Sequence, residues 1–153
     1  MATKFTRAIL RNPGEGISKA ISSKGLSPDF HKAKEQHDQY REILEALGLK
    51  IYTLEALKEF PDSLFVEDPA LVFEDTCIIL RPGVPSRFGE SKILEIDLKD
   101  IFSDIYRVKS GKIEGGDILR IGSHFIVGLS ERTNEEGAKN LGKILETLGC
   151  TLE

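Results

Sequence analysis

The spacing of apolar positions predicts a long helix in the first third of the chain. Residues 28 to 47 have apolar side chains at intervals of three and four, which is the period of one helix face. Ser27 is suited to the N-cap, Pro28 to the first helical position, and Gly48 to the residue just beyond the end. The apolar stripe expected to be buried consists of Phe30, Ala33, Tyr40, Leu44 and Leu47.

Two further helices follow from the same pattern. Residues 134 to 148 form the clearer one, because Thr133 and Glu136 have the spacing of a capping box and Gly149 follows the last apolar position. Residues 89 to 102 fit both a helix and an alternating strand, and we interpret them as a helix. The inward face expected for residues 134 to 148 consists of Ala138, Leu141, Ile144, Leu145 and Leu148.

Short runs rich in Ile, Val and Phe predict seven strands. Two pairs of these runs are separated by two residues, Glu74 and Asp75 in one pair and Gly122 and Ser123 in the other, which predicts two β-hairpins. The strands are expected at residues 5–10, 50–54, 70–73, 76–80, 105–108, 117–121 and 124–129.

The order strand, strand, helix, strand occurs twice, which indicates an internal repeat. Asp68 stands at the head of the first hairpin and Asp117 at the head of the second, and "SRFGE" after one hairpin corresponds to "ERTNEEG" after the other. The segment "ILEALGLKIYTLE" is matched by "ILETLGCTLE", so the chain contains about three repeats.

The last repeat reaches Glu153 just as its final strand begins. A repeat protein normally covers its last edge and apolar face, and this one has no such cap in its pattern. We therefore expect residues 1–153 to form a single domain that is incomplete at its C-terminus. On this view the isolated chain would dissolve poorly or self-associate.

Composition narrows the classes of partner. The chain has 153 residues, a hydrophobic content of 40% and a formal net charge of -4, from 21 basic and 25 acidic residues. These values fit one globular domain, and without a basic run they argue against binding to nucleic acid. No run approaches the roughly 18 apolar residues of a membrane span, and the first residues lack the apolar centre of a signal peptide. A cytoplasmic protein with a small-molecule partner and no membrane is expected; association of identical chains is left open.

The cysteines and histidines do not predict a metal site, a cofactor or a nucleophile. Cys77 lies within the strand "TCIIL" and is expected to be a small buried apolar residue. Cys150 is close to a helix C-terminus, which disfavours a thiolate. His31, His37 and His124 lack the spacing of metal ligands, and His37 falls on the apolar stripe of a helix, where a structural histidine is favoured.

Two segments have a more specific resemblance. "FPDSLFVEDPALVFEDTCIILRPGVPSRFGES" and "IEGGDILRIGSHFIVGLSERTNEEGA" closely resemble the dimethylarginine dimethylaminohydrolases, and a weaker match extends over nearly the whole chain. The resemblance covers only the N-terminal three-fifths of that family. It implies a pseudo-fivefold α/β propeller of ββαβ units, about three of them present here. Five units of about 48 residues would need roughly 240 to 260 residues.

The resemblance implies roles for the acidic residues. A guanidinium is a planar group of N–H donors, and its recognition needs carboxylates, which only accept. By resemblance Asp68 binds this group, Glu114 lies beside it and orients a catalytic histidine, and Glu67 and Asp62 make further contacts. From the residues alone, "FVEDP" is equally well explained as a solvated turn before a strand. The glycines of "EGGD" could likewise form a simple tight turn, because the segment lacks the lysine and hydroxyl residues of a phosphate loop.

Two arginines and an N-terminal segment complete the expected site. Arg87 and Arg132 occupy equivalent places in the two repeats, and the resemblance assigns both to the α-carboxylate of the substrate, a role suited to bidentate arginine. Ion pairs with glutamates at the starts of helices are the alternative. Residues 12–22 resemble a lid over the family's active site, and Ile21 is expected to touch substrate.

The implied reaction converts N-omega-methylated arginine to citrulline and a methylamine through a cysteine thiouronium intermediate. By resemblance, the histidine and the nucleophilic cysteine fall beyond Glu153, so the 153-residue chain alone is expected to be inactive. Two alternatives remain open at this point. One is another guanidine-modifying enzyme, such as an arginine deiminase or an amidinotransferase, and the other is a non-catalytic binding fragment.

Overall fold

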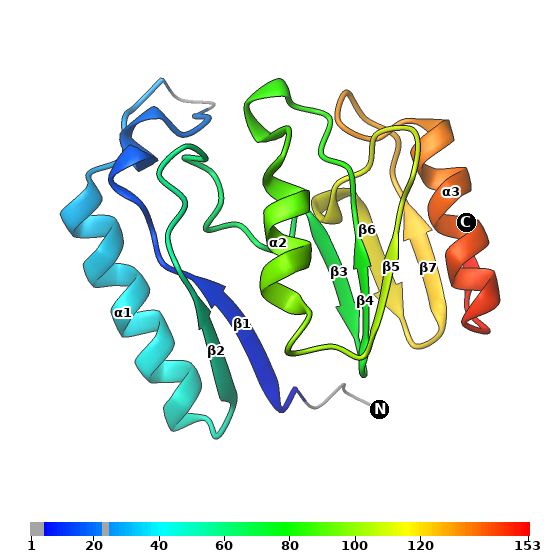
Figure 1. The fold of residues 1–153 in the computed structure, drawn as a ribbon, viewed down its shortest axis with the longest axis horizontal. Helices are drawn as coiled ribbons and strands as arrows, with labels where there is room; N and C mark the ends of the chain where they lie inside the picture. Colours follow the sequence, from blue (N-terminus) through cyan, green and yellow to red (C-terminus); the bar gives the residue numbers. More distant parts are fainter. Residues whose placement is uncertain (1–4, 23–24) are drawn as a thin grey trace. The chain divides into compact units, whose positions relative to one another are not determined.

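The computed structural model describes residues 5–22 and 25–153. The chain divides into two compact units, Met1–Val66 and Glu67–Glu153. Figure 1 shows helices and strands in both, so the α/β class expected from the sequence is confirmed. The single domain expected for residues 1–153 stays a prediction, and each compact unit is described by itself below.

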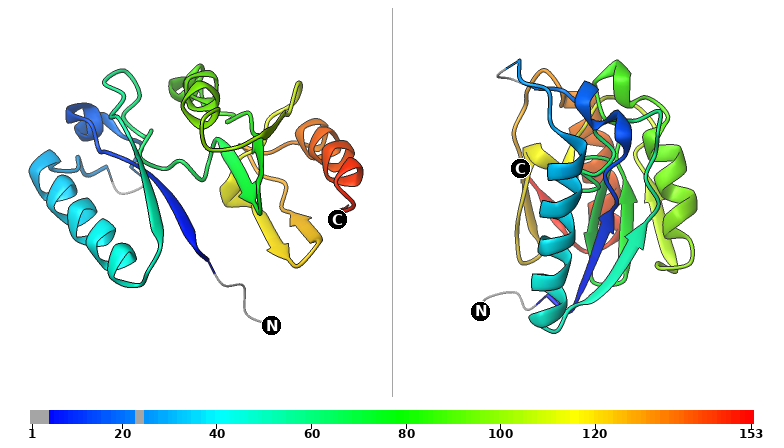
Figure 2. Two further views of the ribbon diagram at one scale, coloured as in Figure 1. Left: turned by 60° about the horizontal axis from the view of Figure 1, so that its bottom comes forward. Right: turned by 90° about the vertical axis from the view of Figure 1, so that its left-hand side faces the viewer.

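The first unit is built around two parallel strands. β1 (Arg7–Arg11) pairs with β2 (Lys50–Leu54), and the chain passes between them through the 3₁₀ helix η1 (Glu15–Lys19) and the helix α1 (Phe30–Ala46). α1 runs alongside β2 in Figures 1 and 2. A strand–helix–strand order with parallel pairing is the expected result when a helix makes the crossover.

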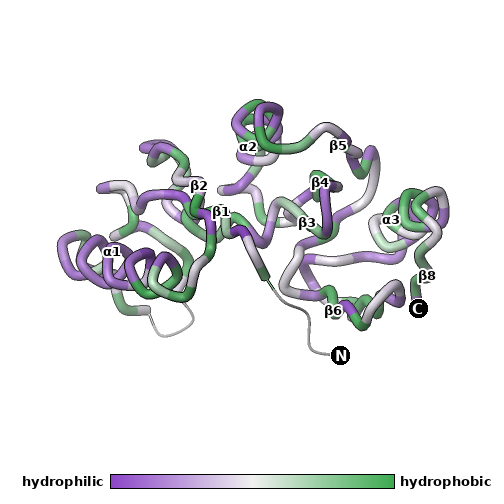
Figure 3. Tube along the Cα trace, turned by 90° about the horizontal axis from the view of Figure 1, so that it is seen from below, coloured by the Kyte–Doolittle hydropathy of each residue, from purple (hydrophilic) through white to green (hydrophobic). Residues whose placement is uncertain are grey.

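α1 has the expected position but a different cap and a more exposed face. Asp29 is its N-cap and accepts a hydrogen bond of 2.8 Å from the backbone N–H of Lys32, so the prediction of Ser27 was wrong. The expected buried stripe is also wrong, since no residue of α1 is buried and Tyr40 is 51% exposed. The physical reason is the small sheet beside it, because two strands offer little surface to a helix that is largely hydrophilic (Figure 3).

The second unit contains two ββαβ repeats, each with a three-stranded sheet. In each sheet the hairpin is antiparallel and the last strand pairs in parallel with the middle one, giving the orders β3-β4-β5 and β6-β7-β8. Both hairpins and the repeat predicted from the sequence are confirmed. The first repeat consists of β3 (Ala70–Phe73), β4 (Thr76–Ile79), η2 (Pro85–Arg87), α2 (Glu90–Leu98) and β5 (Asp104–Arg107). The second consists of η3 (Gly115–Asp117), β6 (Ile118–Ile121), β7 (His124–Val127), α3 (Glu135–Thr147) and β8 (Thr151–Leu152).

The helices of the second unit confirm the ambiguous segment as α2 and correct the cap of α3. Asn134, not Thr133, is the N-cap of α3, and its side chain accepts a hydrogen bond of 2.9 Å from the backbone N–H of Gly137. Gly149 follows the helix with φ of 72°, a conformation suited to glycine. The hydroxyl of Thr133 is engaged elsewhere, as described below.

The core of the second unit lies between the two sheets and α3. Four consecutive residues of the first repeat, 77 to 80, are fully buried, and Phe73 of β3 meets Phe125 of β7 with ring centroids 5.3 Å apart. Leu141 and Leu145 of α3 pack into the same cluster, as the pattern predicted. Figure 2 shows α3 beside the β6–β7 hairpin. This packing fixes the loops that precede and follow each hairpin.

One structural prediction is corrected and one stays open. The first unit is a strand–helix–strand element, not a ββαβ repeat, within the described residues. Its glycine- and proline-containing segment after β1 forms η1 where a second strand would be needed. The strands of the described residues form three small sheets, and the membership of these sheets in a fivefold propeller stays a prediction. Across residues 5–22 and 25–153, no helix is both long and apolar enough to cross a membrane.

Candidate functional site

The chain segments just before and after the two hairpins bring five charged side chains together in the second unit. Asp68 lies two residues before β3, and Arg87 ends η2, the short turn that leads into α2. Glu114 is the residue before η3, and Arg132 lies in the loop between β7 and α3. Four of these side chains were predicted as site residues. The fifth, Glu90 at the start of α2, was not.

Arg87 is held from two sides by carboxylates. Its Nε and Nη2 atoms each donate a 2.7 Å hydrogen bond to a different carboxylate oxygen of Glu90, and Nη1 donates to Asp68. The side chains of Arg87 and Glu90 are 5% and 2% exposed. Burial alone would lower the pKa of Arg87, but the hydrogen bonds and charges of Glu90 and Asp68 raise it above its usual value. The pairing with a glutamate at a helix start, the alternative offered by the sequence, is therefore present for Arg87.

Glu114 is a carboxylate that is almost completely buried. Its side chain is 1% exposed, its Oε2 atom lies 3.3 Å from Nη1 of Arg132, and its Oε1 atom has no hydrogen-bond partner in the described part of the chain. Burial raises the pKa of Glu114, the Arg132 guanidinium opposes this, and the negative charge of Asp68 adds to it. A buried oxygen without a donor is unfavourable, which makes it a good acceptor for an N–H group.

The two glycines of "EGGD" have separate structural reasons. A Cβ atom on Gly115 would lie 2.0 Å from the backbone oxygen of Glu67, so the close approach of these two segments requires glycine. The backbone N–H of Gly115 also donates a 3.0 Å hydrogen bond to the carbonyl of Asp68. A Cβ on Gly116 would instead meet Oδ1 of Asp68 at 3.6 Å and Nη2 of Arg132 at 3.9 Å. Gly116 therefore faces the space between these two charged groups.

The loop that carries Arg132 is held by hydroxyl groups that sequence reasoning missed. Ser130 and Thr133 both donate to Oδ2 of Asp117, over 2.8 and 2.6 Å. The backbone N–H groups of Arg132 and Glu114 donate in turn to these hydroxyls. The available signal was the position of Asp117 at the head of its hairpin, equivalent to Asp68 in the first repeat.

Asp62 and Ile21, two further predicted site residues, belong to the first unit and contact each other there. The backbone N–H of Ile21 donates a 3.0 Å hydrogen bond to Oδ1 of Asp62, whose side chain is buried. Ile21 itself is 60% exposed. Asp62 thus fixes the end of the segment predicted to be a lid, and the contact of either residue with a substrate stays a prediction.

Glu67 is adjacent to the cluster through its backbone, which passes next to Gly115. Desolvation raises the pKa of its carboxyl, its own backbone opposes this shift, and the neighbouring Asp68 adds to it. Its predicted contact with substrate stays a prediction.

Cysteine and histidine chemistry is not part of this cluster. Cys77 is fully buried in β4, and burial raises the pKa of its thiol to about 12, which suits a structural residue. Nδ1 of His124 lies 2.6 Å from the hydroxyl of Thr151, on strands β7 and β8. Within the described ranges, no three His, Cys, Asp or Glu side chains form a group that could hold a metal ion.

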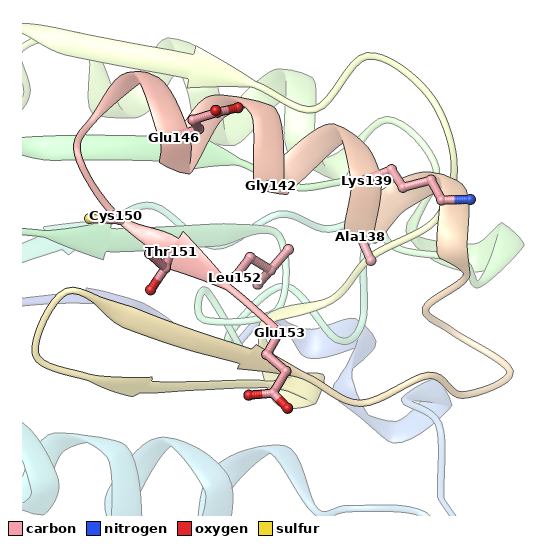
Figure 4. A pocket seen from close by; sticks show the side chains of 8 residues that line it. All are labelled: Ala138, Lys139, Gly142, Glu146, Cys150, Thr151, Leu152 and Glu153. Atoms are coloured by element: carbon pink, nitrogen blue, oxygen red, sulfur yellow. The ribbon is translucent and has the colours of Figure 1, made fainter.

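A groove beside β8 is separate from the charged cluster. It is lined by α3 residues such as Gly142 and by Cys150, Thr151 and Leu152 of the following segment (Figure 4). None of the side chains predicted to bind substrate lines it.

Comparison with protein-family models identifies the family of the chain. The family model described as arginine deiminase matches residues 56–149, which include the whole charged cluster. The chain therefore belongs to the arginine deiminase family. Within that family, the predicted resemblance to the dimethylarginine dimethylaminohydrolases is confirmed by individual relatives.

Two curated relatives carry that name. The dimethylarginine dimethylaminohydrolase of Pseudomonas aeruginosa is 40% identical over 150 residues, which cover 96% of this chain and 59% of the relative. That of Streptomyces coelicolor is 33% identical over 147 residues, covering 94% and 57%. The chain thus spans somewhat less than three-fifths of the length of both.

Solved structures agree with the sequence comparison. A cysteine-to-serine mutant of the Pseudomonas aeruginosa enzyme in complex with citrulline has a TM-score of 0.94 and 38% identity, covering 99% of this chain and 60% of that one. The N-terminal domain of ArgZ, a cyanobacterial arginine dihydrolase, matches with a TM-score of 0.80 at 17% identity, covering 95% and 55%, which shows the fold alone.

Proposed function

We propose that this chain supplies the substrate-binding acids and arginines of a hydrolase that converts N-omega-methylated arginine to citrulline and a methylamine. The observation that carries the proposal is the pair Asp68 and Glu114, one half-buried and one fully buried carboxylate, beside a half-exposed arginine. The similarity to relatives named for this activity, over nearly the whole chain, supports it.

The acidic pair suits a guanidinium. This group is permanently charged and presents N–H donors around a planar rim, so it needs acceptors that do not donate. Asp68 and Glu114 provide such acceptors, and Oε1 of Glu114 has no partner among the described residues. Each charge-assisted hydrogen bond contributes about 1.5 to 3 kcal/mol to binding.

The α-carboxylate of the amino acid is assigned mainly to Arg132. Its side chain is 48% exposed and its ion-pair distances to Glu114 and Asp117 are 3.3 and 3.9 Å, longer than a strong hydrogen bond. Arg87 is already bound by Glu90 and Asp68, so its first role in this proposal is to orient Asp68. The direct contact of Arg87 with substrate expected from the resemblance remains a prediction.

The chemistry requires a thiolate and an imidazole that this proposal places outside the 153 residues. The thiolate attacks the guanidinium carbon, the carbon–nitrogen bond to the methylated nitrogen breaks, and the amine leaves with a proton delivered by the imidazole. Water then attacks the thiouronium carbon, the carbon–sulfur bond breaks, and citrulline forms. Glu114 would orient the imidazole. Cys77 is unsuited to attack, because its buried thiol is protonated at neutral pH.

A second candidate, hydrolysis of unmethylated arginine, is favoured by one finding. The matching family model is described as arginine deiminase. The acidic pair would serve both substrates, because both contain a guanidinium. The two candidates are separated by joining this chain to the C-terminal part of the Pseudomonas aeruginosa relative that it does not cover, and by comparing citrulline release from arginine and from dimethylarginine.

The same joined protein tests the role of Asp68. Asp68→Asn replaces one carboxylate oxygen by an N–H donor, so most of the activity or affinity should be lost while the protein remains folded. Unchanged kinetics would remove Asp68 from the site. Residues 1–153 alone should release no citrulline. Turnover by that chain that disappears in Cys77→Ser or Cys150→Ser would overturn the placement of the nucleophile outside it.

A further inference from the structure

Asp68 and Asp117, the aspartates that precede the two hairpins, have different side-chain partners. Asp68 in the first repeat forms an ion pair with Arg87, the arginine after its own hairpin. Asp117 in the second repeat is equivalent to Asp68 in sequence, but its Oδ1 atom lies 3.9 Å from Nη2 of Arg132. At that distance the pair is not a hydrogen bond.

Asp117 instead binds the loop that carries Arg132. Oδ2 of Asp117 accepts from the hydroxyls of Ser130 and Thr133, and its backbone carbonyl accepts a 2.9 Å hydrogen bond from the N–H of Gly128. The side chain of Asp117 is 15% exposed, and Thr133 is fully buried. Hydrogen bonds to a carboxylate at this degree of burial are strong and directional.

The hydroxyls of Ser130 and Thr133 also accept hydrogen bonds from the backbone of the charged cluster. Oγ of Ser130 accepts from the backbone N–H of Arg132 over 3.0 Å, and Oγ1 of Thr133 accepts from the backbone N–H of Glu114 over 3.2 Å. One carboxylate therefore fixes the backbones of both Arg132 and Glu114. The side chain of Arg132 remains 48% exposed.

We propose that Asp117, through Ser130 and Thr133, is a positioning residue that sets the distance between Arg132 and Glu114 and leaves the Arg132 guanidinium available to a ligand carboxylate. Only the availability of Arg132 to a ligand carboxylate rests on the proposed function. The positioning itself is a property of the unliganded chain.

The test replaces the buried hydroxyl. Thr133→Val keeps the shape of the side chain but removes both its donor to Asp117 and its acceptor for Glu114, whereas Thr133→Ser keeps both and is the matched control. The readout is the pKa of Glu114, followed by carbon-detected NMR of the joined protein without ligand. Arg132 lowers this pKa against the effect of burial, while Asp68 raises it and Arg87 and the Gly83 backbone lower it.

Thr133→Val should shift the pKa of Glu114 upward, because Arg132 is no longer held beside it, and Thr133→Ser should not. In an Arg132→Ala background the same valine substitution should add no further upward shift, since there is no cation left to displace. Ser130→Ala, which removes the other hydroxyl, should act in the same direction as Thr133→Val. An unchanged pKa in Thr133→Val, or an equal shift with and without Arg132, would overturn the proposal.

Binding measurements on the same proteins separate this inference from the proposed function. Thr133→Val should bind dimethylarginine at least about tenfold more weakly than the wild type, the equivalent of one charge-assisted hydrogen bond. If the wild-type joined protein binds no dimethylarginine but the pKa shifts as expected, the proposed function fails and the positioning role stands. If the wild type and Thr133→Val bind equally well and the pKa is unchanged, the positioning role fails and the proposed function stands.

Discussion

Arg87 and Arg132 follow equivalent hairpins 45 residues apart, yet their surroundings differ sharply. The side chain of Arg87 is 5% exposed and is bound by two carboxylates, one of them bidentate. The side chain of Arg132 is 48% exposed and its ion pairs are long. The first repeat provides a glutamate at the start of its helix, at position 90, whereas the corresponding loop of the second repeat uses Ser130 and Thr133 to occupy Asp117.

The two copies of one repeated element can therefore serve different purposes, stability in one copy and binding in the other. A buried arginine whose N–H groups are occupied fixes neighbouring carboxylates and has little capacity for a ligand. A half-exposed arginine whose side chain makes only long ion pairs can exchange its partners. The same hairpin, turn and helix thus provide a structural ion pair in one repeat and a candidate binding group in the other.

The largest effect is expected from removing the buried arginine. Arg87→Ala leaves Glu90 and Asp68 without their cation in a buried setting, which should cost about 3–5 kcal/mol in the free energy of unfolding. Arg132→Ala should cost less, about 1 kcal/mol, because this arginine is half-exposed and its ion pairs, at 3.3 and 3.9 Å, are long. Urea denaturation of both variants checks the contrast, with Arg87→Lys as the control that keeps only the charge. Equal losses for the two alanine variants would contradict a structural role for Arg87 that Arg132 does not share.

Gly115 and Gly116, which precede Asp117, provide the next comparison. Gly115→Ala places a Cβ 2.0 Å from a backbone oxygen and should destabilise the chain by about 3 kcal/mol. Gly116→Ala makes only ordinary contacts and should fold normally, but it should weaken dimethylarginine binding because the methyl group lies between Asp68 and Arg132. Thermal unfolding and calorimetric titration separate the two outcomes. Tight binding by the Gly116 variant would show that the ligand does not occupy this space.

A smaller effect is expected at the start of α3. Asn134 caps this helix and also accepts a 2.9 Å hydrogen bond from the backbone N–H of Lys112, whereas α2 starts at Gly89 without a side-chain cap. Asn134→Ala should therefore cost about 1 kcal/mol, and Asn134→Asp should cost less because it retains the acceptor. Denaturant midpoints measure both. A neutral alanine variant would mean that the loop before α3 does not depend on this cap.

The smallest effect concerns pH. Because the folded-state pKa of Glu114 is raised above its usual value of 4.5, its contribution to stability is present at low pH and is lost as the pH rises through the folded-state value. The stability of the wild type relative to Glu114→Gln should therefore fall as the pH rises from about 4 to neutrality. Glu67 shifts in the same direction but is common to both proteins. A difference that is constant with pH would show that Glu114 titrates normally.

Most helices and strands were predicted from the sequence, because the spacing of apolar residues and the residue types in turns act locally. The strands at 50–54 and 70–73, both hairpins and α3 were predicted with their positions nearly correct. Errors arose where the outcome depends on surroundings. The face of α1 is exposed because the sheet beside it is narrow. Asn134 caps α3 in place of Thr133 because the hydroxyl of Thr133 donates its hydrogen bond to Asp117.

Four residues of the charged cluster were predicted from the sequence. The burial and the partners of their side chains were not, because these depend on contacts between segments that are distant in the sequence. Asp68, Arg87, Glu114 and Arg132 were chosen by their resemblance to a family and do lie in one unit. Their individual environments did not follow from the pattern. Arg87 and Glu90 have the i, i+3 spacing of an ion pair, but nothing in the sequence shows that this pair is buried while Arg132 remains half-exposed.

The proposed binding role of Arg132 depends on whether this arginine recognises the carboxylate of an amino acid that carries a guanidinium. Calorimetric titration should compare dimethylarginine with its decarboxylated counterpart, using the joined protein and its Arg132→Ala variant. We expect Arg132→Ala to weaken binding of dimethylarginine by about tenfold or more while barely changing binding of the decarboxylated compound. Equal losses for the two ligands, or none for either, would contradict it.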